Sequence, residues 1–402
     1  MYTKRTLERS VLEASRTFPV VLVTGPRQVG KTTMLRHLAS DRTYVTLDDL
    51  GPRELARSDP GLFFQRYPPP VLVDEVQQAP GLLDQVKVLV DRDPGARGAF
   101  WLTGSQHFAL MRGVSESLAG RVCVLRMLGF SVAEEAGRGA GVLPFRPDRI
   151  VDAPSITVSD VFTRIVRGAY PRLAQPDAPA RDLWYGSYVQ TYVERDVRAM
   201  LDVARLQAFE TFLRVAAARV GQLINLADMA RDIGVAPSTV QQWLAVMEAT
   251  FQILLLRPYH TNRTSRETKT PKLYFLDTGL AAWLGRWSSA ETAAAGAMAG
   301  ALLENHVVAE VAKSWWHRGR EAPLWFWRTK DGAEVDLIVE DDGLLYPVEV
   351  KLASRPDRRA LTGIGRLRAT GVAVGPGCVA CLADSRWPID GYVEAMNVAS
   401  IA

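Results

Sequence analysis

Cysteine is scarce in this chain, with only Cys123, Cys378 and Cys381 among its 402 residues. Cys378 and Cys381 form one CxxC pair, and the sequence lacks the second pair that would complete a zinc site of this kind. The pair lies in the apolar stretch CVACLA, so we interpret both cysteines as small apolar residues of a strand. We therefore assign no metal or redox chemistry to cysteine.

Long apolar runs are also missing. A membrane-spanning helix needs about 20 consecutive, mostly apolar residues, and the longest apolar runs in this sequence are far shorter. The first 18 residues, MYTKRTLERSVLEASRTF, lack the apolar core of a signal peptide. We therefore expect a protein without a membrane partner, located in the cytoplasm of a bacterium or archaeon.

A large excess of charge of one sign is absent as well. The chain has 48 basic and 44 acidic residues, which gives a formal net charge of +4. This balance permits contact with nucleic acid but does not imply it, and any basic surface must be local. Apolar residues make up 48% of the chain, as in ordinary globular proteins, and its length predicts two or three domains.

A phosphate-binding pattern follows the first apolar run. The sequence predicts a strand over residues 18–23 and a helix over residues 31–38. Between them, GPRQVGKT matches G-x-x-x-x-G-K-[ST] in the strand–loop–helix setting that gives this pattern its meaning. A chance glycine-rich turn is a poor explanation for eight positions in that setting. The predicted nucleotide-binding residues are Gly25, Pro26, Arg27, Gln28, Val29, Gly30, Lys31, Thr32 and Thr33.

Each position in this loop has a physical role. Gly25 and Gly30 allow the backbone to turn its N–H groups inward around a phosphate, and the helix that follows points its positive end at the same anion. Lys31 supplies an ammonium for the outer phosphates, and Thr32 supplies a hydroxyl ligand for magnesium. Arg27 is a weak candidate for an arginine finger. The pattern predicts an ATP or GTP site.

Two acids follow a second apolar run. Residues 71–73 are Val-Leu-Val and precede Asp74 and Glu75, which is typical of a buried parallel strand that carries a carboxylate to its C-terminal edge. Asp74 could hold magnesium there, and Glu75 could be the general base that polarises the attacking water. An ordinary strand ending in solvated acids is the alternative, and the upstream phosphate loop argues against it.

Other polar residues are candidates for the same edge. The predicted strand AFWLTGSQ ends in Thr103, Ser105 and Gln106, which could sense the γ-phosphate or position water. Arg121 precedes the next predicted strand and could be an arginine finger, either in its own subunit or from a neighbouring one. A surface salt bridge would explain Arg121 about as well.

These motifs together carry a family resemblance. GPRQVGKTT, LDD, DEVQQAP, TGSQ and SESLAGR occur in this order, and the chain resembles the AAA-type, STAND-like ATP-binding proteins of bacteria and archaea over nearly its whole length. These proteins carry a C-terminal region of unknown function. The resemblance implies ATP and Mg²⁺, with Lys31, Thr32, Asp74 and Glu75 in the phosphate, magnesium and water roles. No N-K-x-D motif of GTPases is evident, which agrees with ATP.

The middle of the chain begins with residues 136–160, which are rich in glycine and proline and predict a connector. Residues 184–201 have helical spacing. Their Glu194, Arg195 and Asp196 match an ERD stretch of the resembled family. We interpret these three as an intrachain salt-bridge cluster, and a contact with the nucleotide site is the alternative.

A helix-turn-helix follows. Residues 225–235 predict a helix with an Asn cap and a Gly end, and residues 237–250 predict a second helix. The exposed start of the second helix would face a DNA major groove. Its candidate contact residues are Ser238, Thr239, Gln241 and Gln242.

Two strands, residues 251–259 and 271–277, surround the basic stretch TNRTSRETKT and predict a wing. Four basic residues of this wing would suit DNA phosphates: Arg263, Arg266, Lys269 and Lys272. Against DNA contact, the second helix has no Lys or Arg between 237 and 250. A structural lid or a protein-binding module is the alternative.

The C-terminal region predicts the order αβββαβ, with helices over 298–318 and 357–370 and strands over 324–329, 334–340, 344–351 and 378–383. This order, with Asp on the second strand and Glu-x-Lys on the third, resembles the PD-(D/E)xK nuclease-like superfamily. The resemblance implies that Glu304, Asp336 and Glu349 hold magnesium and that Lys351 stabilises charge or orients water. Many domains of this fold are inactive, so a scaffold or nucleic-acid grip is the alternative.

We therefore expect an α/β chain with a RecA/ASCE-like parallel P-loop sheet, a winged helix-turn-helix and a small nuclease-like domain. The expected boundaries are 1–140, 141–204, 205–290 and 295–402. The first hypothesis is an ATPase that switches its attached domains in DNA-related, defence or toxin-like processes. A metal-dependent DNase gated by ATP and a DNA-binding regulator without significant turnover are the alternatives. Expected partners are ATP, DNA and a second copy of the chain.

Overall fold

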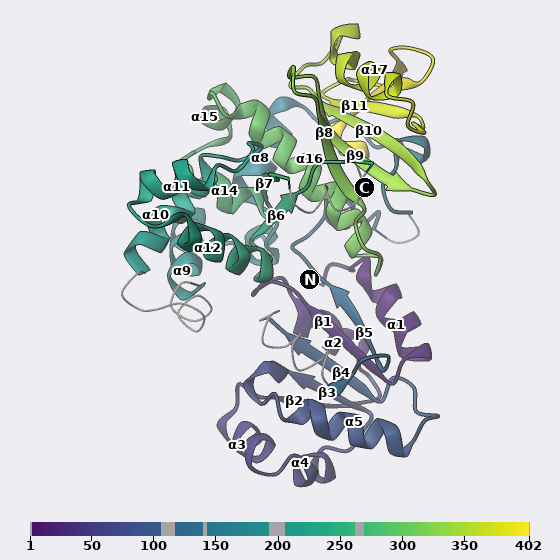
Figure 1. The fold of residues 1–402 in the computed structure, drawn as a ribbon. Helices are drawn as coiled ribbons and strands as arrows, with labels where there is room; N and C mark the ends of the chain where they lie inside the picture. Colours follow the sequence, from purple (N-terminus) through teal and green to yellow (C-terminus); the bar gives the residue numbers. More distant parts are fainter. Residues whose placement is uncertain (1, 106–116, 140–142, 193–205, 262–268, 402) are drawn as a thin grey trace.

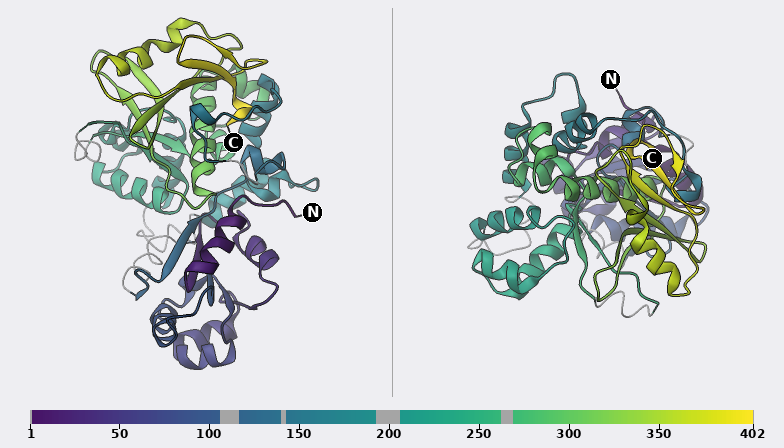
Figure 2. Two further views of the ribbon diagram at one scale, coloured as in Figure 1. Left: turned by 90° about the vertical axis from the view of Figure 1, so that its right-hand side faces the viewer. Right: turned by 90° about the horizontal axis from the view of Figure 1, so that it is seen from above.

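A computed structural model describes residues 2–105, 117–139, 143–192, 206–261 and 269–401. Two sheets lie at opposite ends of the molecule, and a helical region (α8 to α15) lies beside the second sheet (Figure 1). The left view of Figure 2 shows the same separation of the two sheets. In the part of the chain that the structure describes, no helix is both long enough and apolar enough to cross a bilayer.

The N-terminal sheet has five parallel strands in the order β2-β3-β4-β1-β5. Its strands are β1 (Val20–Thr24), β2 (Thr43–Thr46), β3 (Val71–Asp74), β4 (Phe100–Gly104) and β5 (Val122–Arg126). Its helices are α1 (Leu7–Thr17), α2 (Lys31–Leu38), α3 (Leu50–Ser58), α4 (Pro60–Arg66) and α5 (Leu82–Arg92). The strands predicted at residues 18–23, at residues 71–73, at AFWLTGSQ and after Arg121 are present, and the parallel arrangement of the sheet fits a P-loop NTPase.

Burial on both faces explains why β1 is continuously apolar. Val21 and Val23 pack with residues of α1 and α2, whereas Val20 and Leu22 pack with residues of α3, α4 and α5. A strand covered on both sides has no face left for polar residues. Since β1 lies between β4 and β5 and β3 lies beyond β4, the carboxyl ends of β1, β3 and β4 meet at one edge of the sheet.

The helical region contains the predicted pair of short helices. α11 (Leu226–Ile233) begins at Asn225, whose side chain accepts bonds from two backbone N–H groups, and ends at Gly234 with a left-handed backbone. The other described helices of the helical region are α8 (Val158–Arg167), α9 (Arg181–Tyr192), α10 (Leu206–Ala217), α12 (Pro237–Ala249), α14 (Thr278–Leu284) and α15 (Ala290–Ala295). The two strands that follow α12 are β6 (Ile253–Leu256) and β7 (Lys272–Phe275), an antiparallel pair shorter than predicted.

The second sheet has six strands in the order β12-β13-β11-β10-β9-β8. Its elements are α16 (Ala299–Trp316), β8 (Leu324–Arg328), β9 (Glu334–Asp341), β10 (Leu344–Val350), α17 (Thr362–Ala369), β11 (Gly377–Cys381), β12 (Trp387–Pro388) and β13 (Val393–Asn397). The predicted order αβββαβ is therefore present, and β11 contains the apolar cysteines. The last two strands are not predicted from the sequence, because β12 has only two residues and Asp390 and Gly391 separate it from β13.

The predicted connector is packed rather than loose. The backbone N–H of Phe145 donates to Ser314 Oγ at 3.0 Å, and Trp315 Nε1 donates to the Phe145 carbonyl at 3.1 Å. Phe145 is buried in the same apolar core as α8, α16 and the second sheet. Phe145, an apolar residue within this glycine- and proline-rich stretch, therefore attaches the connector to α16.

Two apolar cores cross the boundaries between regions. One contains Val29 of the phosphate loop together with Tyr170, α9 and α10. The other contains Leu128 together with α8, β6, β7, α16 and the second sheet. Since each core draws side chains from several regions, neither sheet is packed independently of the helical region.

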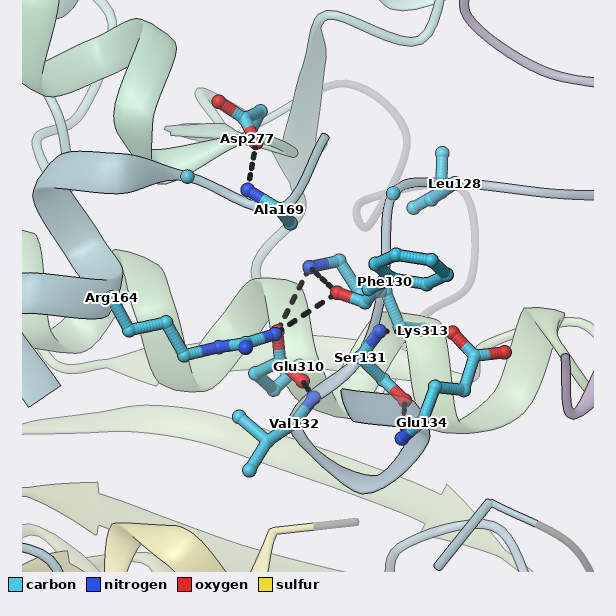
Figure 3. Close-up of polar contacts among 12 residues, drawn as sticks. Leu128, Phe130, Ser131, Val132, Glu134, Arg164, Ala169, Asp277, Glu310 and Lys313 are labelled. Carbon is cyan, nitrogen blue, oxygen red and sulfur yellow. Dashed lines mark hydrogen bonds and ion pairs between the residues drawn. The ribbon is translucent and has the colours of Figure 1, made fainter. Parts of the chain in front are cut away.

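Buried charges join the chain after β5 to α16 (Figure 3). Lys313 Nζ donates to the Phe130 carbonyl at 3.2 Å and to Glu310 Oε1 at 2.8 Å, and Glu310 Oε2 accepts the Val132 N–H at 2.8 Å. Arg164 of α8 donates to the same Phe130 carbonyl at 3.0 Å and lies 3.7 Å from Glu310. Burial alone would raise the pKa of Glu310, but Lys313 and Arg164 lower it to about 2.

The pKa of Glu310 makes stability depend on pH. Its folded value of about 2 lies below the ordinary 4.5, so its contribution is full above pH 4.5 and is lost as pH falls toward 2. Glu310→Gln should lower the free energy of unfolding by about 3 kcal/mol at pH 7, and this deficit should shrink below pH 4.5. Urea unfolding at several pH values measures it. Glu321→Gln, which removes an exposed pair with Arg126, should cost less than about 1 kcal/mol, and equal deficits for the two variants would contradict the prediction.

Candidate functional site

The phosphate loop leaves the end of β1 and enters α2. Gly25 has φ +150°, and a Cβ there would lie 1.9 Å from the Met127 carbonyl oxygen, so the backbone of residue 127 closes directly against the loop. Gly30 caps α2 with φ +90°. The two glycines are therefore required by a close approach and by a left-handed backbone, as the loop pattern predicts.

The ammonium of Lys31 lies inside the loop. It donates to the carbonyls of Gly25 at 2.9 Å and Pro26 at 2.8 Å, and the side chain is buried. Both acceptors belong to the loop that would surround a phosphate. Lys31 is therefore held at the position from which it could transfer its hydrogen bonds to phosphate oxygens.

Asp74 lies at the end of β3, opposite the start of α2. Its Oδ1 accepts hydrogen bonds from Thr32 Oγ1 at 2.7 Å and from Thr103 Oγ1, and its Oδ2 accepts one from Tyr44 at 3.3 Å. A threonine hydroxyl beside a carboxylate is an oxygen donor pair of the kind that Mg²⁺ binds next to nucleotide phosphates. The residues present therefore fit a magnesium ion here.

Glu75 follows with a left-handed backbone, φ +58°. Its N–H donates to Thr103 Oγ1 at 3.0 Å, and its Oε2 accepts bonds from Ser105 Oγ at 3.3 Å and from Gln77 Nε2. The carboxylate of Glu75 is thus held by two side chains. Gln77 is not among the residues predicted from the sequence, although it lies in the DEVQQAP motif, because the motif does not show which way a glutamine points.

Arg121 does not lie near the loop of its own chain. Val20 pairs with Val122 at the start of β1, so residue 121 lies at the amino edge of the parallel sheet, whereas the loop leaves the carboxyl edge. Arg121 instead bonds Asp91 at 2.6 and 3.1 Å. The predicted arginine finger within one subunit is therefore wrong, and the surface salt bridge is observed. A role from a neighbouring subunit stays a prediction.

Arg5 and Pro171 also lie against the phosphate loop, although neither belongs to a sequence motif. Buried Arg5 donates to the Val29 carbonyl at 2.8 Å and to the Leu128 carbonyl at 2.7 Å, and it pairs with Glu134 at 3.1 Å. Pro171 lies 4.0 Å from the place where a Cβ of Gly30 would stand. A lone arginine near the N-terminus and a proline 141 positions after Gly30 give no signal of this proximity in the sequence.

The structure brings the four predicted C-terminal residues together. Lys351 Nζ lies 2.9 Å from Glu349 Oε2 and 3.6 Å from Asp336 Oδ2, and Asp336 Oδ2 also accepts the Val350 N–H at 2.8 Å. Burial and the charge of Asp336 raise the pKa of Glu349 to about 9. Glu304 of α16 has a raised pKa for the same two reasons.

Lys272 also enters this group, which corrects its predicted role. Its side chain is 4% exposed, and Nζ lies 3.0 Å from Glu304 Oε1 and also pairs with Glu334. Burial would lower the pKa of Lys272, but Glu304 and Glu334 raise it overall. A lysine buried among carboxylates cannot reach a DNA phosphate. We call Glu304, Glu334, Asp336 and Glu349 the acid cluster.

The acid cluster does not fit a metal ion in this arrangement. Its carboxylates already pair with Lys272 or Lys351. Among the described residues there is no group of three or more His, Cys, Asp or Glu side chains placed to hold a metal.

The residues of α12 that were predicted to face DNA differ in their exposure to solvent. Ser238, Gln241 and Gln242 are exposed, but Thr239 is 5% exposed and belongs to the inner face of the helix. Lys269 is exposed. The predictions for Gln106, Glu194, Arg195, Asp196, Arg263 and Arg266 lie outside the described residues.

Three family models match the chain. The model described as an AAA domain matches residues 17–135, and two domains of unknown function, DUF8612 and DUF4143, match residues 158–291 and 299–401. The AAA match covers the five-stranded sheet and the phosphate loop.

Two curated relatives are uncharacterized mycobacterial proteins, Rv2008c of Mycobacterium tuberculosis and Mb2031c of Mycobacterium bovis. Each is 32% identical to this chain over 342 residues, which is 84% of this chain and 71% of the relative. A solved structure, the Walker-type ATPase PABY2304 of Pyrococcus abyssi, is 16% identical with a TM-score of 0.44 and covers 69% of this chain and 94% of that chain. A TM-score of this size does not establish a shared overall fold.

The contact between Gly25 and Met127 can be tested directly. Gly25→Ala should weaken ATP binding at least ten-fold, because a methyl group 1.9 Å from a carbonyl oxygen must displace either the loop or the chain after β5. Titration with a fluorescent ATP analogue measures this effect. Gly81→Ala is the matched control, since a Cβ at position 81 meets nothing within 4 Å. Unchanged ATP affinity in Gly25→Ala would contradict the prediction.

Proposed function

Because this chain belongs to the family of the mycobacterial protein Rv2008c and carries an AAA domain at residues 17–135, we propose that it is a Mg²⁺-dependent ATPase whose nucleotide state changes the arrangement of its attached domains. One observation carries the proposal. Lys31, Thr32, Asp74 and Glu75 converge at the carboxyl edge of one parallel sheet. Thr103 donates to the Asp74 carboxylate and accepts the backbone N–H of Glu75.

Each residue then has a defined task. The loop N–H groups and Lys31 bind the phosphates, and Thr32 and Asp74 would hold the magnesium ion. That ion would supply charge neutralisation at the phosphate oxygens. Glu75 accepts the proton of the attacking water at a carboxylate oxygen. Gln77 and Ser105 already donate to Oε2 and compete with water for that oxygen.

Arg5 offers a route from the nucleotide to the other domains. It bonds the carbonyls of Val29 and Leu128 and pairs with Glu134. Glu134 also lies 3.3 Å from His317, which directly follows α16, and His317 Nε2 accepts the Leu128 N–H at 3.0 Å. A change in the phosphate loop would therefore act, through Arg5 and Glu134, on the buried imidazole at the end of α16.

A DNA-binding regulator without significant turnover is the second candidate. The observation in its favour is the pair of helices α11 and α12, which present Ser238, Gln241 and Gln242 at the exposed start of α12 as a helix-turn-helix would. In either case we propose that α10 to β7 act as a winged helix. The third alternative, a metal-dependent DNase, is disfavoured because the acid cluster does not fit a metal ion.

The loop and the acids are tested by ATP hydrolysis with and without DNA. Lys31→Ala should weaken ATP binding and abolish turnover, whereas Glu75→Gln should retain ATP binding and lose at least a hundred-fold in kcat. Lys330→Ala, at an exposed lysine in the turn between β8 and β9, is the control and should leave both unchanged. Turnover that survives Lys31→Ala would refute the ATPase. Tight ATP binding without turnover in the unsubstituted chain, together with salt-sensitive DNA binding, would establish the second candidate.

Gln77 should control how readily Glu75 acts as a base. A hydrogen bond donated to a carboxylate stabilises the charged form and makes it a weaker base. Gln77→Ala should therefore raise kcat several-fold with unchanged affinity for ATP. Single-turnover hydrolysis beside equilibrium ATP binding separates these quantities. A ten-fold fall in kcat would show instead that Gln77 is needed to position Glu75.

A further inference from the structure

We propose that Lys272 is a cation built into the chain that occupies the acid cluster in place of a metal ion and thereby locks the β6–β7 hairpin to the second sheet. The proposal concerns a site away from the phosphate loop and does not depend on ATP hydrolysis.

The position of Lys272 is the first argument. It is the first residue of β7, yet its ammonium pairs with Glu304 on α16 and with Glu334 on β9. The Tyr274 hydroxyl donates to the same oxygen of Glu304, and the ammonium lies 5.6 Å from the centre of the Phe326 ring on β8. The side chain of Lys272 is 96% buried, and a buried charge is stable only with such partners. Removing the ammonium would leave Glu304 and Glu334 without their shared positive partner.

The charges of the acid cluster are the second argument. Lys272 pairs with Glu304 and Glu334, and Lys351 lies against Asp336 and Glu349, so each of the four acidic side chains has an ammonium beside it. A divalent cation binds through the same carboxylate oxygens. A divalent cation would therefore compete with these two ammonium groups. The buried charge of Lys272 in particular would repel it from Glu304 and Glu334.

Backbone contacts of the hairpin are the third argument. The Phe326 N–H donates to the Arg257 carbonyl at 3.0 Å, and the Tyr259 N–H donates to the Phe326 carbonyl at 2.5 Å, so the chain after β6 runs along β8. β7 is joined to the same region by Lys272. The segment that follows β6 is therefore attached to the second sheet by backbone bonds, and β7 is attached to it by an ion pair with Glu334.

Two consequences follow from this arrangement. The acid cluster holds its own lysine rather than a metal ion while the hairpin is docked. Lys272, between Glu304 and Glu334, in turn adds an ion pair to the backbone bonds that hold the hairpin against the second sheet. The ion pairs of Lys272 with Glu304 and Glu334 therefore inhibit metal binding by the acid cluster.

The test is a titration of the full chain with Mn²⁺ in the absence of nucleotide, followed by calorimetry. The unsubstituted chain should show no site that is lost in Asp336→Asn. Lys272→Met should gain one site that binds Mn²⁺ at least ten-fold more tightly than anything in the unsubstituted chain, and Lys272→Met/Asp336→Asn should lose it. Lys269→Met, an exposed lysine three positions earlier, is the matched control and should gain nothing.

Hydrogen exchange tests the lock itself. The amides of residues 253–256 and 272–275 should exchange at least ten-fold faster in Lys272→Met than in the Lys269→Met control. If Lys272→Met does not fold, the double variant Lys272→Met/Glu334→Gln takes its place in both measurements. The double variant removes one charge of each sign. An Asp336-dependent Mn²⁺ site in the unsubstituted chain, or unchanged hairpin exchange in the variant, would overturn the proposal.

Discussion

The structure depends on one close contact, the approach of the Met127 carbonyl to Gly25 of the phosphate loop. The chain after β5 leaves no space for a side chain at position 25, so the loop is closed from behind by residues that continue into the rest of the molecule. Arg5 reinforces this contact by bonding carbonyls on both sides of it, at Val29 and Leu128. Nucleotide chemistry and domain packing therefore share the same few backbone atoms.

Buried charges carry this contact into the rest of the protein. Glu134 pairs with Arg5 and lies against His317, while Glu310, Lys313 and Arg164 bind the chain at Phe130 and Val132. A buried network of this kind is stable only when all its members are paired, and it has few alternative arrangements. A displacement of the phosphate loop would thus shift the contacts of α8 and α16 at the same time. A switch driven by nucleotide requires this kind of coupling.

The acid cluster beside the second sheet resembles a metal site in its residues, but lysine side chains lie against its acids. Asp336 lies on β9, Glu349 lies on β10 and Lys351 directly follows β10, as the nuclease-like resemblance expects, and Glu304 of α16 lies near them. Lys272, from a different part of the chain, adds a second ammonium to the cluster. The cluster then serves as a joint between the hairpin and the sheet, because opposite charges with little access to water hold better than they would on a surface.

The sequence by itself determined the phosphate loop, the strands that carry Asp74 and Glu75, the helices around Gly234 and the αβββαβ order, because these depend on local patterns of apolar residues, caps and glycines. Only the tertiary structure decided that Arg121 lies at the wrong edge, that Thr239 and Lys272 are buried, and that Arg5, Pro171 and Gln77 reach the site. The physical reason is that strand order and the packing between regions place these side chains, and both depend on contacts between residues far apart in the chain, which no local pattern records.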